Sequence, residues 1–170
     1  MSTLVNLADP RQDVHRVRKP QPGLHRYTVA ERLLPNVVGK RIIELGGGTG
    51  DMSRRMRTLG ANVTFADLSP SNVANAACDG FHALQLDLNR GLPDIANESY
   101  DGIVMLEIIE HLVAVEHMLS EVHRVLRKGG FLVLSTPNFV FLYNRLRILS
   151  GKLSCDEGYH YRFFTPSSLE

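Results

Sequence analysis

The chain has 170 residues, of which 44% are apolar and 22% are charged, as is usual for a globular protein. Nineteen lysines and arginines against eighteen acidic residues leave a formal net charge of +1. This composition excludes a disordered chain, a collagen-like chain and a small disulfide scaffold. The near-zero charge argues against nucleic acid or an anionic membrane as the partner, and the length predicts one domain.

Cysteine usage and the start of the chain bear on the compartment. Cys78 and Cys155 are too few for a disulfide framework or a zinc cage, and such scarcity is typical of a reducing compartment. Residues 1–10 lack the basic start and apolar run of a signal peptide. No apolar stretch approaches the ~18 residues of a membrane span. We therefore expect a cytoplasmic protein with no membrane segment.

The first residues differ in composition from the rest. Residues 1–26 show no apolar period, contain three prolines and collect five basic side chains. This composition predicts a solvated N-terminal arm. The alternative is a lid that becomes ordered over a ligand. The globular domain is expected to span residues 27–170.

From residue 28 onward, strand and helix patterns alternate. Thr28 and Glu31 have capping-box spacing, which predicts that a helix begins there. Ser69 and Pro70 predict the N-cap and first position of another helix. A long helical stripe is expected to end at Gly129-Gly130. The expected strands span residues 41–45, 62–66, 81–86, 100–106 and 131–135. Strands that alternate with helices predict an α/β fold with a doubly wound parallel sheet.

A glycine-rich turn follows the first predicted strand. Residues 44–50 read Glu-Leu-Gly-Gly-Gly-Thr-Gly, and Asp51 opens the next helix. Ligands of doubly wound sheets bind at the carboxyl ends of strands, where this turn lies. Asp67 ends the next strand, at a suitable place to accept both hydroxyls of a ribose. Turn, strand end and acid together predict a nucleoside site.

The glycine spacing argues against a dinucleotide. The dinucleotide fingerprint is G-x-G-x-x-G, and its third glycine would fall on Asp51, whose charge would repel a pyrophosphate. The observed spacing is G-x-G-x-G, with Glu44 two residues before the first glycine. This acid favours a ligand that carries a cationic group.

These residues resemble class I S-adenosylmethionine-dependent methyltransferases, whose fold is Rossmann-like. The resemblance covers residues 28–169 and rests on Glu44 to Gly50, Asp67, the run Leu86-Asp87-Leu88, Tyr100-Asp101 and Arg127 to Gly130. It implies that the turn cradles S-adenosylmethionine, that Asp67 holds the ribose and that Asp87 faces the adenine amino group. The residues implied in cofactor binding are Glu44, Gly46, Gly47, Gly48, Gly50, Asp67, Leu68, Asp87, Leu88 and Leu106.

A Glu-x-x-Glu-His run follows the fourth strand. Glu107, Glu110 and His111 would share one face of a helical turn. His111 can act as a general base with Glu107 beside it, the run can bind a divalent metal with His160 as a fourth ligand, or the group can be structural. We take His111 and Glu107 as the catalytic candidates and favour no metal.

The same run resembles ubiquinone-pathway O-methyltransferases and small-RNA 2′-O-methyltransferases, and Ser135 to Asn138 adds to the second likeness. The leading prediction is methyl transfer to the oxygen or nitrogen of a small molecule, with nucleic acid disfavoured. Residues 84–92, 135–138 and 145–149 also resemble MetW-like proteins, which act as partners of a biosynthetic acyltransferase. A non-catalytic partner protein is therefore the alternative, and an NAD-dependent oxidoreductase a further one.

The end of the chain bears on assembly. The resemblance implies a further helix and a strand pair after the fifth strand, so we expect either a chain truncated at its C-terminus or an unusually short member of the family. We predict five parallel strands in the order 3-2-1-4-5. The edge at residues 131–135 would be covered by a helix over residues 139–149 or by a second subunit. A homodimer is the predicted assembly.

Overall fold

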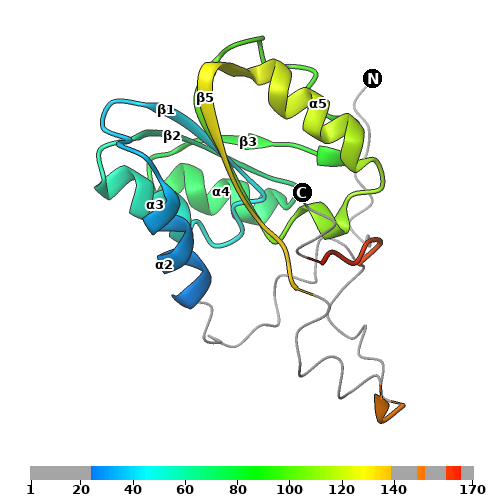
Figure 1. Cartoon of the computed structure of the whole chain (residues 1–170). Coiled ribbons are helices and arrows are strands. Elements are labelled where there is room, and N and C mark those ends of the chain that lie inside the picture. The colour runs from blue at the N-terminus through cyan, green and yellow to red at the C-terminus, as the bar shows by residue number, and fades with distance from the viewer. Residues whose placement is uncertain (1–23, 139–148, 152–159, 166–170) are drawn as a thin grey trace.

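The described residues form one twisted parallel sheet of five strands. The structure is a computed structural model and describes residues 24–138, 149–151 and 160–165. The strand order is β3-β2-β1-β4-β5, which confirms the predicted order and fold class (Figure 1). The strands are β1 (Arg41–Leu45), β2 (Asn62–Asp67), β3 (His82–Gln85), β4 (Tyr100–Leu106) and β5 (Leu126–Ser135).

Helices cover both faces of this sheet. Figure 1 shows α5 on one side and α2, α3 and α4 on the other. Each helix buries one stripe: α3 turns Met52 and Met56 onto Ile42, whereas α5 packs Met118 and Val122 onto the opposite face. The helices are α2 (Leu24–Leu33), α3 (Asp51–Thr58), α4 (Pro70–Cys78) and α5 (Val115–Val125), with short 3₁₀ turns η1 (Leu88–Arg90) and η2 (Ile109–His111).

The register of the strands places their carboxyl ends at one edge. Leu45 pairs with Ala66 across β1 and β2, and Leu106 pairs with Ser135 across β4 and β5. The glycine turn after β1, Asp67 at the end of β2 and the residues after β4 therefore meet at this edge.

Two helix boundaries differ from the prediction. α2 begins at Leu24, so Thr28 lies inside the helix and the predicted capping box is wrong.

The second difference is at the end of α5. This long helix ends at Val125, and Gly129 and Gly130 belong to β5. Between the pairs Tyr100–Leu126 and Gly102–Phe131 the register shifts, and these glycines lie in the irregularity. A Cβ on Gly130 would lie only 2.8 Å from a backbone oxygen, so close approach of the backbone requires glycine there.

The connection from β3 to β4 carries only η1, and Arg124 of α5 holds it. The Arg124 guanidinium donates to the backbone oxygens of Leu92 and Ile95, at 2.7–2.8 Å, and to the side chain of Asn97. Glu121 accepts two further bonds from the same guanidinium. This network replaces a crossover helix in fixing the loop before β4.

Several predictions fall partly or wholly outside the described residues. The predicted arm over residues 1–26 overlaps α2 by three residues, and residues 1–23 are not described. The predicted covering helix over 139–149 has only Leu149 among the described residues. Within the described part, β5 is an outer strand of the sheet, and the homodimer stays a prediction. No helix in the described ranges is long and apolar enough to cross a membrane.

Gly47 and Phe65 provide a test of packing beneath the glycine turn. The Phe65 ring is fully buried, and a Cβ on Gly47 would overlap it. Gly47→Ala should therefore lower the free energy of unfolding by about 1–3 kcal/mol through overpacking. In a Phe65→Leu background the same change should cost less, because the smaller side chain leaves room. Urea unfolding of the four chains measures this coupling, and strictly additive costs would contradict it.

Candidate active site

The glycine turn lies against the end of β2. The backbone nitrogens of Gly46 and Gly47 donate to the carbonyl oxygen of Ala66 at 2.8 and 3.0 Å. Gly46, Gly48 and Gly50 have φ angles of 75°, 55° and 76°, in the left-handed region that favours glycine. The turn predicted from the sequence is thus a tight backbone loop at the carboxyl edge, and Asp51 begins α3 directly behind it.

Asp67 ties this turn to the start of α4. Its Oδ2 accepts from the Gly48 nitrogen at 2.8 Å, and its Oδ1 accepts from the Ser69 nitrogen and the Asn72 amide at 2.8 and 3.2 Å. The Asp67 side chain is buried among these donors. A carboxylate oxygen can accept two hydrogen bonds, so Oδ2 keeps capacity for a hydroxyl. Asp67 lies at the end of β2, as the sequence indicates, and its contact with a ribose stays a prediction.

Glu44 is buried between β1 and α3. It is 3% exposed, and its Oε2 accepts from the Ser53 hydroxyl. Burial raises the pKa of Glu44 to about 7, with smaller contributions in the same direction from Asp67 and Asp51, although the Ser53 bonds oppose the shift. Its contact with a cationic ligand group stays a prediction.

The raised pKa of Glu44 has a consequence for stability. Below its ordinary value of 4.5 the carboxyl is protonated in both states, and between 4.5 and about 7 only the unfolded chain loses the proton. Stability should therefore fall as pH rises through this window, by up to about 3 kcal/mol from this group. Glu44→Gln should gain stability relative to the parent chain over the same window. Urea unfolding of both chains at about pH 5 and about pH 8 measures their difference in free energy of unfolding. A difference that does not change with pH would contradict the prediction.

The residues implied in adenine binding do not all lie together. Asp87 caps η1 by accepting from the Asn89 nitrogen at 3.1 Å, and Leu68 and Leu88 are half-buried. Leu88 packs on the α5 face of the sheet, whereas Leu106 belongs to the cluster beside α3 on the opposite face. Asp87, Leu68 and Leu88 follow β2 and β3, and Leu106 is separated from Leu88 by the sheet.

Glu107 does not share a helical face with Glu110 and His111, so that prediction is wrong. Its φ of 58° is left-handed, and the turn η2 begins only at Ile109. The Glu107 nitrogen donates to the Ser135 oxygen at 3.0 Å, and its Oε1 accepts from the Ser135 hydroxyl at 2.7 Å. Contact with β5, rather than helical periodicity, holds this acid at the edge.

Glu110, His111 and His160 form a compact group. One ligand atom from each lies within 4.8 Å of the others, and the two imidazole rings meet edge-on with centroids 4.7 Å apart. Glu110 is 2% exposed, and its Oε1 lies 3.9 Å from His111 Nε2. Burial, followed by the nearby charge of Glu107, raises the pKa of Glu110 to about 7. The Glu107 carboxylate is not part of this group.

His160 reaches the group from far along the chain. The nitrogens of Tyr161 and Arg162 donate to the Glu110 carbonyl oxygen at 2.8 and 3.3 Å, and Arg162 forms a two-pronged ion pair with Glu116. A buried carboxylate with two imidazoles suits either proton transfer or a divalent cation. Among the described residues, Glu110 Oε1 has no hydrogen-bond partner and is buried, which fits both uses.

The segment that leads into this group contacts the glycine turn. A Cβ on Gly46 would overlap the Ile108 side chain, so the segment between β4 and η2 packs directly on the turn. The structure also assigns contacts to residues given no role from the sequence, namely Ser53, Asn72, Thr136 and Arg162. Ser135 and Thr136 were part of a recognisable motif, but sequence spacing alone does not pair them with particular acids.

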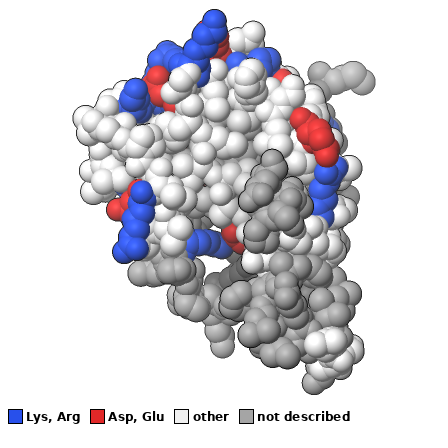
Figure 2. All heavy atoms as spheres, viewed as in Figure 1, with Lys and Arg blue, Asp and Glu red and all other residues white. Residues whose placement is uncertain are grey.

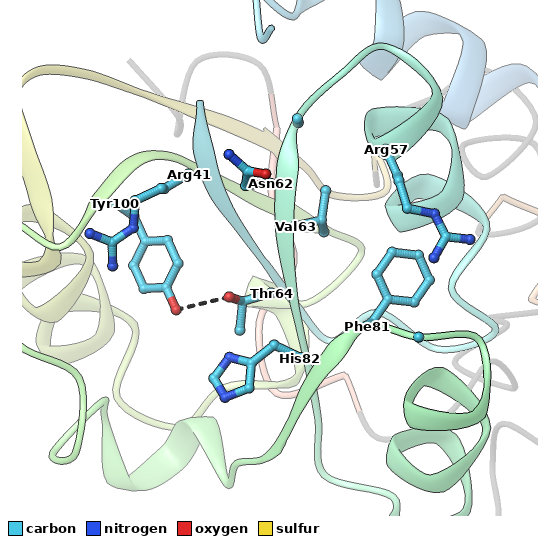
Figure 3. A pocket seen from close by; sticks show the side chains of 10 residues that line it. Arg41, Arg57, Asn62, Val63, Thr64, Phe81, His82 and Tyr100 are labelled. Atoms are coloured by element: carbon cyan, nitrogen blue, oxygen red, sulfur yellow. Dashed lines mark hydrogen bonds between the residues drawn. The ribbon is translucent and has the colours of Figure 1, made fainter. Parts of the chain in front are cut away.

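A cavity of about 370 Å³ lies elsewhere, at the amino ends of the strands (Figure 3). The Tyr100 hydroxyl donates to Thr64 there, and Arg41 lies over the Tyr100 ring. Figure 3 shows Arg57 with Phe81 on the other side of β2, so the two guanidinium groups do not converge. The cavity is separate from the candidate site.

Comparison with known proteins agrees with the fold. A family model described as a methyltransferase domain matches residues 15–170. A ubiquinone biosynthesis O-methyltransferase of Xanthomonas oryzae is 34% identical over 130 residues, which cover 70% of this chain and 54% of that protein. A demethylmenaquinone methyltransferase of Tropheryma whipplei is 30% identical over 112 residues, which cover 65% of this chain and 47% of that protein.

A solved structure shows the same architecture. The S-adenosylmethionine-dependent methyltransferase of Mesorhizobium loti aligns with a TM-score of 0.61 and 29% identity, covering 65% of this chain and 53% of that chain. The present chain thus spans about half the length of the curated relatives named above.

Proposed function

Because this chain belongs to the family of methyltransferase domains, we propose that it transfers the methyl group of S-adenosylmethionine to a hydroxyl of a small aromatic acceptor of the quinol type. The observation that carries the proposal is the Glu110–His111–His160 group, which follows the segment packed on the glycine turn. A hydroxyl acceptor must lose a proton, and an imidazole backed by a carboxylate is suited to take it. The names of both curated relatives support an acceptor of the quinone class.

The cofactor site proposed here is the edge formed by the turn, Asp67 and Asp87. The Asp67 carboxylate would hold the ribose, and the turn would lie against the cofactor at Gly48, where a Cβ would meet open space, so that the backbone allows close approach. S-adenosylmethionine supplies a methyl group that its sulfonium already activates. The chain's remaining task is to orient the acceptor in line and to exclude water.

His111 is the proposed base. Once its imidazole takes the acceptor proton, the resulting cation lies 3.9 Å from Glu110 Oε1, and an ionised Glu110 would stabilise it. Glu107, fixed by Ser135, adds a second negative charge beside this pair. The protein would catalyse loss of the acceptor's hydroxyl proton to His111 while the acceptor oxygen bonds to the methyl carbon.

The charge distribution on the face shown in Figure 2 supports a small acceptor rather than nucleic acid. On the face shown in Figure 2, basic and acidic side chains lie in small mixed groups, with a broad uncharged area between them. A nucleic-acid site would need basic side chains gathered on one face.

Asp67 provides the first test of the proposal. Asp67→Ala should weaken binding of S-adenosylhomocysteine ten-fold or more, because a charged hydrogen-bond acceptor is worth about 1.5–3 kcal/mol. Asp94→Ala, at an exposed position in the loop before β4, is the control and should bind normally. Isothermal titration calorimetry measures both. If the parent chain binds no S-adenosylhomocysteine, the non-catalytic alternative is favoured.

His111 provides the second test. His111→Ala should lower turnover of a catechol acceptor by roughly 10²–10⁴-fold with cofactor affinity unchanged, because the base acts on the acceptor alone. His82→Ala, at an exposed position on β3, is the matched control. Activity that survives chelation would eliminate the metal alternative. Loss on chelation, restored by added divalent cation, would instead assign Glu110, His111 and His160 as metal ligands.

A further inference from the structure

Two hydroxyls at the end of β5 each bind one of the two acids of the Glu-x-x-Glu-His run. The Ser135 hydroxyl donates to Glu107 Oε1 at 2.7 Å, and the Thr136 hydroxyl donates to Glu110 Oε2 at 3.1 Å. These are neighbouring residues in the chain, and they reach acids that are three positions apart after β4. The parallel pairing of Leu106 with Ser135 places the two segments side by side.

The hydrogen bond from Thr136 determines which oxygen of Glu110 is available to interact with His111. Because Oε2 accepts from Thr136, the other oxygen, Oε1, is the one that lies 3.9 Å from His111 Nε2. Oε1 has no hydrogen-bond partner among the described residues, although it is buried. A buried carboxylate with one oxygen held and the other open has a defined orientation toward its neighbour.

Ser135 has the corresponding effect on Glu107. It accepts from the Glu107 nitrogen through its backbone oxygen and donates to the carboxylate through its hydroxyl. These two bonds hold Glu107 in the left-handed conformation, with φ at 58°, which is uncommon for a residue other than glycine. The strained backbone therefore depends on β5 for its stability.

We propose that Ser135 and Thr136 are positioning residues, which orient Glu107 and Glu110 so that the open oxygen of Glu110 faces His111 and His160. This inference rests on the proposed function, since it gives the oriented acids a role in acceptor chemistry. Neither hydroxyl is required to touch the cofactor or the acceptor. Each acts through the carboxylate that it binds.

Thr136→Val tests the proposal, because valine keeps the shape of threonine and removes the hydroxyl. Turnover of the catechol acceptor should fall about ten-fold or more, since the buried carboxylate loses the hydroxyl that donates to its Oε2. KM for S-adenosylmethionine and affinity for S-adenosylhomocysteine should not change. Thr136→Ser, which keeps the hydroxyl, should restore most of the turnover. Thr58→Val, which removes a hydroxyl at the exposed end of α3, is the matched control.

Crystal structures of the parent chain and of both Thr136 variants provide a measurement that does not depend on activity. The Glu110 carboxylate should rotate in Thr136→Val and return to its original orientation in Thr136→Ser. An unrotated carboxylate with unchanged turnover would overturn the proposal, as would equal losses in the valine and serine variants. If the parent chain methylates no acceptor, the proposed function fails, and the crystal structures still decide whether Thr136 orients Glu110. Should Thr136→Val not fold, Ser135→Ala with Glu107 as the reporter replaces it.

Discussion

The alignment of the parallel strands is the constraint on which the rest of the site depends. Leu45, Asp67, Leu106 and Ser135 end their strands at one edge because each strand is hydrogen-bonded in register to its neighbour. The candidate groups lie within a few residues of the carboxyl end of a strand, and His160 is next to residues that hydrogen-bond to such a segment. A shift of a single strand by two residues would separate the glycine turn from Asp67 or the acids from Ser135.

Two buried carboxyl groups, those of Glu44 and Glu110, lie near the carboxyl edge of the sheet. Glu44 and Glu110 are both almost inaccessible, and burial raises the pKa of each to about 7. Their surroundings differ: Glu44 bonds the Ser53 hydroxyl of α3, whereas Glu110 keeps one oxygen without a hydrogen-bond partner in the described part of the chain. A desolvated carboxylate oxygen with no such partner reduces folding stability, and proteins retain such groups where chemistry requires them. This difference favours Glu110 over Glu44 as the group that takes part in proton transfer.

Local patterns in the sequence predicted most of the fold. β1 and β4 have their expected bounds, and Ser69 accepts from the Asn72 nitrogen as a helix N-cap should. Two errors came from the same kind of evidence. Thr28 and Glu31 have capping-box spacing inside an established helix, and Gly129-Gly130 has a helix-ending pattern within a strand. In both places tertiary contacts outweighed a local preference.

The sequence by itself determined the strand-and-helix alternation, the glycine turn and the acid that ends β2, because each depends on residues only a few positions apart. Only the tertiary structure decided which partners the acids have. Thr136 lies 26 residues from Glu110, and His160 is 49 residues from His111. Nothing in local spacing specifies such pairs. They arise because parallel strands end at one edge and because the nitrogens of Tyr161 and Arg162 hydrogen-bond to the Glu110 carbonyl there.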